Sequence, residues 1–310
     1  MLSCEMFSPE EKETISKSIK HISLETIERE MNQLMLIGTS GTKKRSRIGN
    51  NIVDFFTFTH RLETKGKYDT NFFEFVHRLE EFKQKKFIQN MLIYYKEVKN
   101  KNNTKSEMTV LKEVYNICIS AINIIRPLVY MEIYAKYKPT CVFDFCAGWG
   151  GAAVAAAALK IDKYIGIEMN TNLEEPYQRC IQFLKEKSPH TTIDMIFDDA
   201  RNVDCTQLTY DLVFTSPPYY FIQKYQNNST FASKKEMDEL FYIPLFSKTY
   251  EGLQPGGHYA INVCKEVYEN VLFKLFGEAH ESFSFQKSKR QNDYNEIVYV
   301  WRKADVDPIV

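Results

Sequence analysis

The chain has 310 residues, of which 44% are hydrophobic and 26% charged, and its 40 Lys and Arg balance its 40 Asp and Glu. This composition is ordinary for a globular protein and leaves room for one large domain or two modest ones. Its seven cysteines form no CxxC pair. They therefore argue against a disulfide framework or a zinc site and favour a reducing compartment. We expect no bound metal.

Neither a signal sequence nor a membrane span is expected. The first residues, MLSCEMFSPEEKE, contain no apolar signal region. The longest apolar stretch, ICISAINIIRPLVYMEIYA, is interrupted by Arg126, Pro127 and Glu132, so it lacks the continuous apolar length of a membrane helix. We expect an intracellular protein, cytoplasmic or associated with nucleic acid, that is not secreted.

The region 1–138 is expected to be mainly helical. Ser8, Pro9 and Glu11 form a helix start, with a serine cap, a proline in the first turn and a glutamate three residues after the cap. The segments IGTSGTKKRSRIGN and KNKNNTKSE are predicted loops. The phenylalanines of VDFFTF and NFFEFVHRL are predicted core residues.

Positive charge gathers in this first region. Basic side chains exceed acidic ones by six over 1–138, with the densest groups in KKRSR (43–47) and in 83–105. Such groups are either phosphate-binding surface or solvated helix faces and loops, and the sequence does not decide between the two.

From 139 to 310 the pattern changes to alternating strands and helices. Strands are predicted in CVFDFC (141–146), KYIGIEM (163–169), TIDMIFDD (192–199), YDLVFTS (210–216) and GHYAINVC (257–264). SFSFQKS and NEIVYVWRK form a predicted terminal strand pair. A helix should begin at the Ser233–Glu236 capping box, with a kink or break at Pro244. Together these elements predict an α/β fold with a doubly wound, mostly parallel sheet and a terminal antiparallel pair, preceded by the helical region.

A glycine-rich turn, DFCAGWGG (144–151), connects the first predicted strand to its helix. Glycines at such a turn let the backbone approach a ligand closely and let the helix N-terminus point at it. The turn lacks the GxGxxG pattern, which argues against an NAD oxidoreductase. Trp149 either lines a ligand pocket or packs within the turn. Cys146 has no histidine nearby in the sequence, so we do not expect a catalytic nucleophile there.

Carboxylates are expected at the carboxyl ends of the first three strands: Asp144, Glu168, and Asp198 with Asp199. Open α/β sheets bind their ligands at this edge. An ionised carboxylate only accepts hydrogen bonds, so Glu168 can bind two ribose hydroxyls. A glycine turn beside these acids suits a ligand with a cationic centre, a ribose and an amino-bearing base. S-adenosylmethionine has all three.

The segment TSPPYY (215–220) follows the fourth predicted strand. Proline cannot donate to a sheet ladder, so the strand should end here. The rings of Tyr219 and Tyr220 are then held at the end of a strand rather than in a core. A rigid corner with aromatic rings and a polar edge is typical of a small site that stacks a flat group.

DFCAGWGG and TSPPYY together resemble the amino-group DNA methyltransferases, which belong to the class I S-adenosylmethionine-dependent methyltransferases and methylate cytosine N4 or adenine N6. The resemblance covers about 139–303 and implies a Rossmann-like methyltransferase fold with S-adenosyl-L-methionine as cofactor. Phe145 stands where the family usually has proline. The implied cofactor residues are Asp144, Cys146, Ala147, Gly148, Gly150, Glu168 for the ribose and Asp199 for the adenine amino group. The implied catalytic corner that holds the target base consists of Ser216, Pro217, Pro218 and Tyr219.

The resemblance also implies a substrate. The Ser216 hydroxyl and the Pro217 carbonyl would accept amino hydrogens of the target, and Tyr219 would stack on the base. Serine at this position favours cytosine N4 over adenine N6, and a base in a duplex would have to be flipped out. DNA is therefore the expected partner, with RNA possible. The alternatives are a methyltransferase acting on RNA or on a protein glutamine amide, and a catalytically inactive nucleic-acid-binding protein of the same fold.

The order of the motifs leaves no room for a target-recognition insertion between the cofactor turn and the base corner. Recognition is therefore expected from the N-terminal third, from the 221–236 loop, or from the 285–295 turn, where KSKRQND either contacts phosphates or is a solvated turn. The sequence specifies neither the recognition site nor the oligomeric state.

Overall fold

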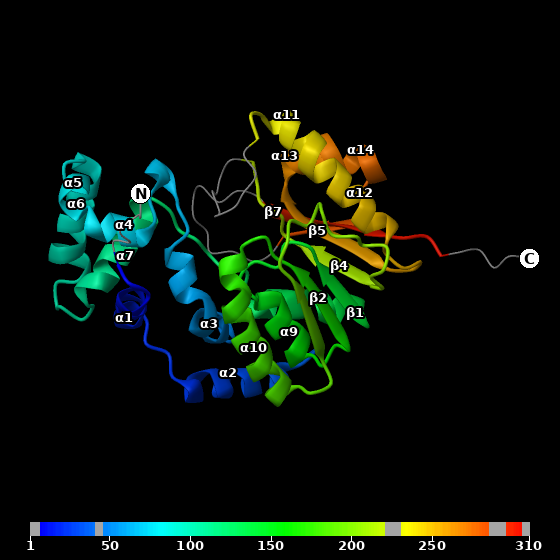
Figure 1. Cartoon of the computed structure of the whole chain (residues 1–310), viewed down its shortest axis with the longest axis horizontal. Helices are drawn as coiled ribbons and strands as arrows, with labels where there is room; N and C mark the ends of the chain where they lie inside the picture. Colours follow the sequence, from blue (N-terminus) through cyan, green and yellow to red (C-terminus); the bar gives the residue numbers. More distant parts are fainter. Residues whose placement is uncertain (1–6, 41–45, 221–230, 285–295, 306–310) are drawn as a thin grey trace, which may run out of the picture.

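A computed structural model describes residues 7–40, 46–220, 231–284 and 296–305. The N-terminal part is helical, as expected from its sequence. Figure 1 shows α1 and α4–α7 gathered at one end of the molecule, whereas α2 and α3 lie beside α9 and α10. The helical elements are α1 (Pro9–Ile19), α2 (Leu24–Ile37), α3 (Asn50–Leu62), η1 (Lys67–Asp69), α4 (Phe72–His77), α5 (Leu79–Phe82), α6 (Lys86–Tyr94), η2 (Tyr95–Lys99), α7 (Glu107–Cys118) and α8 (Pro127–Tyr137).

The second part is built on one seven-stranded sheet with the strand order β3-β2-β1-β4-β5-β7-β6. The five neighbouring strands β3, β2, β1, β4 and β5 pair in parallel, and β7 runs antiparallel to β5 and β6. This arrangement confirms the doubly wound, mostly parallel sheet with a terminal antiparallel pair. The strands are β1 (Cys141–Asp144), β2 (Lys163–Ile167), β3 (Thr192–Ile196), β4 (Leu212–Thr215), β5 (His258–Cys264), β6 (Glu281–Phe283) and β7 (Glu296–Arg302).

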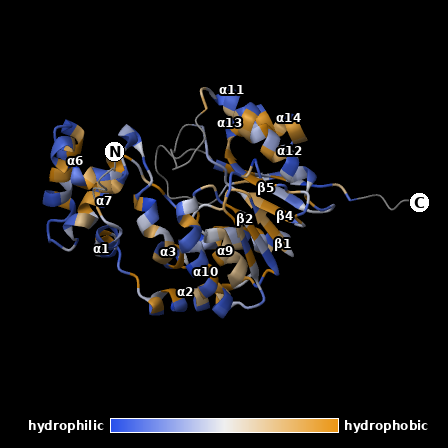
Figure 2. Ribbon diagram, in the orientation of Figure 1, coloured by the Kyte–Doolittle hydropathy of each residue, from blue (hydrophilic) through white to orange (hydrophobic). Residues whose placement is uncertain are grey.

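Helices cover both faces of the sheet because the strands bury side chains on both sides. In β4, Leu212 and Phe214 face the core that contains α9, whereas Val213 faces the core that contains α12. Figure 2 shows the resulting hydrophobic interior between the layers. The helical elements of this part are α9 (Gly151–Ala158), η3 (Thr171–Leu173), α10 (Glu174–Lys187), α11 (Lys234–Met237), η4 (Asp238–Tyr242), α12 (Ile243–Glu251), α13 (Lys265–Val267), η5 (Tyr268–Leu272) and α14 (Phe273–Phe276).

The N-terminal helices contribute to two hydrophobic cores. Ile27, Met31 and Leu34 of α2, together with residues of α3 and α8, pack in the same core as the alanine-rich α9. The other core is formed by α4–α7 and includes Phe72, Phe75 and further aromatic side chains. The phenylalanines expected in a core are therefore largely buried, and part of the N-terminal region completes the layer on one face of the sheet.

Local sequence signals act largely as expected. Ser8 accepts from the backbone N–H of Glu11 and caps α1, and Ser233 caps α11 through Glu236. Pro244 does not break the helical segment, because it lies in the first turn of α12, where a missing N–H is tolerated, and a π-turn (η4) precedes it. β2 and β3 end earlier than predicted, so Glu168 and Asp199 lie in the loops after these strands.

No helix in the described part of the chain is long and apolar enough to cross a bilayer. Among the same residues, no group of three or more His, Cys, Asp or Glu side chains is placed to hold a metal ion.

Candidate active site

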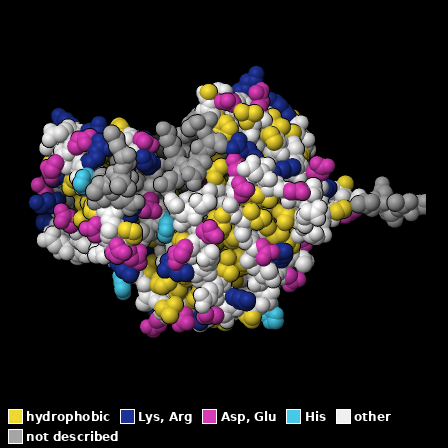
Figure 3. Space-filling model, viewed as in Figure 1, with side chains coloured by type: hydrophobic (Ala, Val, Ile, Leu, Met, Phe, Trp, Pro, Cys, Tyr) yellow, Lys and Arg dark blue, Asp and Glu magenta, His cyan; other side chains and the backbone are white. Residues whose placement is uncertain are grey.

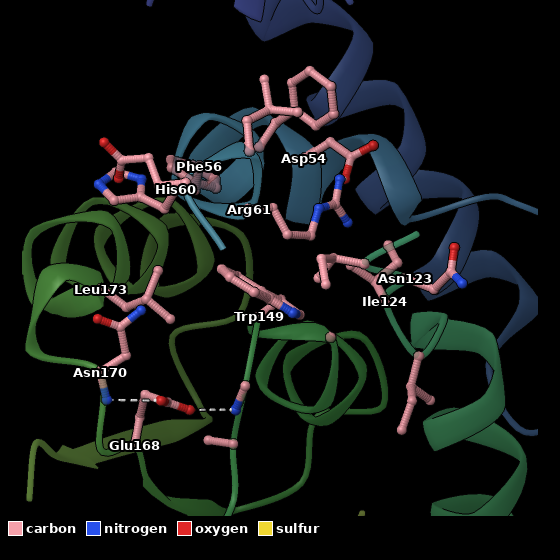
Figure 4. A pocket seen from close by; sticks show the side chains of 18 of the residues that line it. Asp54, Phe56, His60, Arg61, Asn123, Ile124, Trp149, Glu168, Asn170 and Leu173 are labelled. Atoms are coloured by element: carbon pink, nitrogen blue, oxygen red, sulfur yellow. Dashed lines mark hydrogen bonds and ion pairs between the residues drawn. The ribbon is translucent and has the colours of Figure 1, made fainter. Parts of the chain in front are cut away.

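A cleft of about 2700 Å³ lies between the carboxyl edge of the sheet and the N-terminal helices. Its lining includes the glycine turn, the loops after β2 and β3, and the corner after β4 on one side. The other side is formed by α3, α7 and the segment 121–126. Figure 4 shows Trp149 of the glycine turn facing Arg61 of α3 and Ile124 of this segment.

The glycine turn lines the cleft with Cys146, Ala147, Gly148 and Trp149. Gly148 and Gly150 have positive φ values of 59° and 91°, which L side chains rarely adopt. A Cβ on Gly148 would meet only the carbonyl oxygen of Cys146 within 4 Å, at 3.9 Å, so the space beside this residue is open. Two hydrogen bonds fix the turn. Ala147 N–H donates to the carbonyl of Ile167 at the end of β2 (2.9 Å), and Tyr177 Oη donates to the carbonyl of Gly148 (3.1 Å).

Glu168 connects the loop after β2 to this turn. One carboxylate oxygen accepts from Gly148 N–H (2.7 Å) and the other from Asn170 N–H (2.9 Å), as the dashed lines in Figure 4 show. Burial raises the pKa of Glu168 to about 7, against the opposing effect of these backbone hydrogen bonds. Each oxygen retains lone-pair capacity for a ligand.

Asp144 lies beneath the site and does not belong to the cleft lining. Its side chain is completely buried and accepts hydrogen bonds from Cys146 N–H (3.2 Å) and Tyr164 Oη (3.3 Å). The bond from Cys146 N–H connects this carboxylate to the first residues of the glycine turn. Burial raises the pKa of Asp144 to about 6. Gly150 likewise lies behind the lining, at the start of α9. Cys146 faces the cleft, and burial raises its pKa well above that of an ordinary thiol, which opposes a nucleophilic role.

Asp199 lies in the loop after β3 and faces the cleft together with Asp198. Its two oxygens accept from Arg201 Nε (3.0 Å each). Partial burial opposes ionisation, but the hydrogen bonds and charge of Arg201 hold the pKa of Asp199 below its ordinary value. Lys248 of α12 fixes the same loop by donating to the carbonyls of Ala200 (2.6 Å) and Val203 (2.9 Å).

Asn262 of β5, which the sequence analysis did not predict, connects the corner after β4 to β5 through hydrogen bonds. Asn262 is 1% exposed, and its Nδ2 donates to Ser216 Oγ (3.0 Å) and Tyr219 Oη (3.2 Å). Ser216 Oγ and Tyr219 Oη are also 3.1 Å apart. The carbonyl of Pro218 accepts from Tyr242 Oη. An asparagine inside an apolar strand, INVC, was the available signal, because a buried amide needs polar partners.

Most of the residues expected at the site are brought to this one cleft. Its lining includes Cys146, Ala147, Gly148, Glu168, Asp199 and all four residues from Ser216 to Tyr219. Trp149 both lines the cleft and packs against the neighbouring cores. The predicted recognition segments lie partly outside the described residues: 221–230 of the 221–236 loop, the whole 285–295 turn with KSKRQND, and 43–45 of KKRSR.

No protein-family model and no curated protein matches the sequence. Solved structures match over part of the chain. TrmN from Thermus thermophilus has 17% identity and a TM-score of 0.40, with 57% of this chain and 48% of TrmN covered. An rRNA methylase from Streptococcus thermophilus has 16% identity and a TM-score of 0.39, with 59% and 99% covered. An RNA methyltransferase from Salinibacter ruber, in complex with S-adenosyl-L-homocysteine, has 12% identity and a TM-score of 0.38, with 61% and 98% covered.

Proposed function

We propose that this chain is an S-adenosylmethionine-dependent methyltransferase that methylates an exocyclic amino group of a DNA base, cytosine N4 in preference to adenine N6. The proposal rests on one observation: the glycine turn with Glu168 and the Ser216–Tyr219 corner line the same cleft. Methyl transfer needs two sites that meet, one for the donor and one for the acceptor. The carboxyl edge of the sheet offers both.

The residues at the turn fit the donor. The open space beside Gly148 admits a ligand to the backbone, and the Glu168 carboxylate can accept from two ribose hydroxyls while it keeps its bonds to Gly148 and Asn170. When bound, S-adenosylmethionine supplies an electrophilic methyl group. We assign the adenine amino group to Asp199, whose oxygens Arg201 already orients.

The Ser216–Tyr219 corner offers hydrogen-bond acceptors that would make an exocyclic amine more nucleophilic. Such an amine is a weak nucleophile because its lone pair is delocalised into the base ring. Ser216 Oγ and the Pro217 carbonyl would accept its two hydrogens, which favours the pyramidal nitrogen with a localised lone pair. Pro217 and Pro218 restrict the backbone, so the acceptors are fixed before the target arrives. The bound donor would supply the methyl group to this nitrogen and leave as its neutral thioether, and the proton that the nitrogen loses would pass to water in the cleft.

Nucleoside mass spectrometry tests this proposal. DNA, RNA and a protein mixture are incubated separately with the purified chain and methyl-labelled S-adenosylmethionine, then digested. We expect label in one methylated nucleoside of DNA, with N4-methylcytosine ahead of N6-methyladenine. Ser216→Ala should lose turnover by about 10²-fold, as expected for one preorganised polar contact in a transition state. It should bind S-adenosylhomocysteine as the wild type does.

The other outcomes separate the alternatives. Label confined to RNA or to a glutamine side chain would replace the DNA assignment and keep the chemistry. Tight cofactor binding without label in any substrate would favour a catalytically inactive nucleic-acid-binding protein. Unchanged turnover in Ser216→Ala would contradict the role of the corner.

A further inference from the structure

The helical wall of the cleft contains a group of three cations and one carboxylate, which we call the cation group: Lys20, Asp54, Arg61 and Lys112. All four residues line the cleft. Asp54 of α3 is paired with both Lys20 and Arg61, so its charge is already shared. Figure 4 shows Asp54 and Arg61 on the wall opposite Trp149.

Lys112 of α7 has no carboxylate of its own in this group. Its ammonium donates to the neutral Asn116 and lies over the rings of Tyr115 (5.2 Å) and Phe72 (5.8 Å). Burial, reinforced by the charge of Arg61 and opposed only in part by Asp54, lowers the pKa of Lys112 to about 7. A partly buried cation beside another cation costs stability unless an anion joins them.

Further cations line this wall of the cleft. Three of them have carboxylate partners: Lys12 pairs with Glu63 (2.9 Å), Lys65 with Asp69 (3.3 Å) and Arg179 with Glu175 (2.9 Å). Arg47 and Arg126 also line the cleft, and Arg126 donates to the carbonyl of Ser46 (3.4 Å). The lysines of 83–105 lie instead on α6, η2 and the adjoining loops, at the end of the molecule formed by α1 and α4–α7. Figure 3 shows basic and acidic side chains interspersed there. The cation group therefore differs from these three ion pairs in having more cations than carboxylates.

We propose that the cation group binds a backbone phosphate of the nucleic acid whose base enters the Ser216–Tyr219 corner. This inference rests on the proposed function, because the group and the corner line one cleft. In the cation group, Lys20, Arg61 and Lys112 share the single negative charge of Asp54. A phosphodiester would add a second negative charge to this group. It would hold the strand at the helical wall while the base reaches the sheet edge. Phosphate contacts position a strand and do not read its sequence.

Binding of fluorescent oligonucleotides to the full chain tests the assignment. Lys112→Met keeps most of the side-chain length and removes the charge. We expect its affinity for DNA to fall roughly tenfold, and the slope of log K against log salt to decrease in magnitude by about one. Lys112→Arg should retain the slope. Lys185→Met, which removes an exposed lysine of α10 away from the cleft, should behave as the wild type.

Two further readouts separate binding from folding. S-adenosylhomocysteine affinity should be unchanged in Lys112→Met, and its melting temperature should not fall, because the substitution removes a desolvated charge. DNA affinity of the wild type should also weaken as pH rises through about 7, where Lys112 loses its proton and Glu168 of the same cleft ionises. Lys112→Met should show a weaker pH dependence, namely the part that Glu168 causes.

The proposal is overturned if Lys112→Met and the wild type share the same affinity and salt slope. It is also overturned if inorganic phosphate alone stabilises the wild type while oligonucleotide affinity is unaffected by the variant, since the site would then take free phosphate. A wild type that binds neither DNA nor RNA would contradict the nucleic-acid substrate itself, which is a different failure. RNA of the same sequence, run in parallel, shows which backbone is preferred.

Discussion

At the residue scale, Glu168 is the side chain whose ionisation is coupled most directly to the proposed cofactor site. It accepts from two backbone N–H groups, and burial raises its pKa to about 7. The ionised carboxylate accepts ribose hydroxyls better than the protonated acid does. Cofactor affinity should therefore depend on pH near neutrality.

We expect S-adenosylhomocysteine affinity to fall as pH decreases through about 7, because Glu168 is protonated there. Glu168→Gln should bind more weakly by about 1.5–3 kcal/mol, the usual strength of hydrogen bonds to a charged group. It should also lose the pH dependence. Isothermal titration calorimetry across this range checks both, and a Gln variant with the wild-type pH slope would contradict the assignment.

Asp144 is the second residue whose burial has a measurable consequence. Its pKa is raised to about 6 by complete burial, so its ionised form destabilises the folded state. This cost is present above about pH 6 and disappears below the unfolded pKa of about 3.9.

Asp144→Asn should therefore stabilise the protein at alkaline pH, by at most about 3 kcal/mol for a shift of about two pKa units. The gain should shrink between about pH 8 and about pH 5. Urea unfolding at the two pH values measures it. A variant less stable than the wild type at both pH values would show that the bonds from Cys146 and Tyr164 outweigh the burial cost.

At the scale of elements, the loop after β3 is held by a side chain from α12. The Lys248 ammonium donates to three backbone carbonyls, those of Ala200 (2.6 Å), Arg201 (2.9 Å) and Val203 (2.9 Å). Because this loop carries Asp199, its position should affect cofactor binding.

Lys248→Met should destabilise the protein by about 1–2 kcal/mol and weaken S-adenosylhomocysteine binding several-fold. Lys303→Met is the matched control, since Lys303 likewise donates to carbonyls, those of Glu251 (2.5 Å) and Leu253 (2.6 Å), at the end of α12. It should lower the melting temperature and leave cofactor affinity unchanged. Thermal unfolding and calorimetry on both variants check the difference, and equal cofactor affinities would contradict the role of Lys248.

The sequence predicted these elements where a short-range pattern determines them. Short apolar runs predicted β1 to β5, and TSPPYY ended β4 because proline cannot continue a ladder. Contacts between distant segments were not predictable. Asn262 of β5 contacts Ser216 at the end of the neighbouring strand β4, and Asp144 is buried outside the cleft lining. Both depend on the pairing of β4 with β5 and on the packing of β1, which no local pattern encodes.

At the scale of the whole molecule, the helical region and the sheet share a core. Leu34 of α2 is completely buried and packs in the cluster that contains α9. Every residue of α9 from Gly151 to Ala158 is buried. Ile52, Val53 and Phe56 of α3 pack in the same core, so this part of the helical wall is fixed to the sheet that carries the glycine turn.

Leu34→Ala should destabilise the whole molecule by about 2–5 kcal/mol, the usual cost of a large-to-small change in a core. Leu36→Ala, on the same helix but with Leu36 86% exposed, should cost less than about 0.5 kcal/mol. Both tryptophans, Trp149 and Trp301, lie in the second part of the chain, so their fluorescence reports on the sheet. If the two parts unfold together, Leu34→Ala lowers the fluorescence midpoint and the circular-dichroism midpoint equally. A shift in only one signal would show that the parts unfold separately.

The central claim is that methyl donor and target amine meet between the glycine turn and the Ser216–Tyr219 corner. A crystal structure with S-adenosylhomocysteine and an oligonucleotide tests it most directly. The account predicts the ribose on Glu168 and the target amine within hydrogen-bond distance of Ser216 Oγ and the Pro217 carbonyl. A cofactor bound away from the glycine turn, or a base that does not reach Ser216, would contradict it.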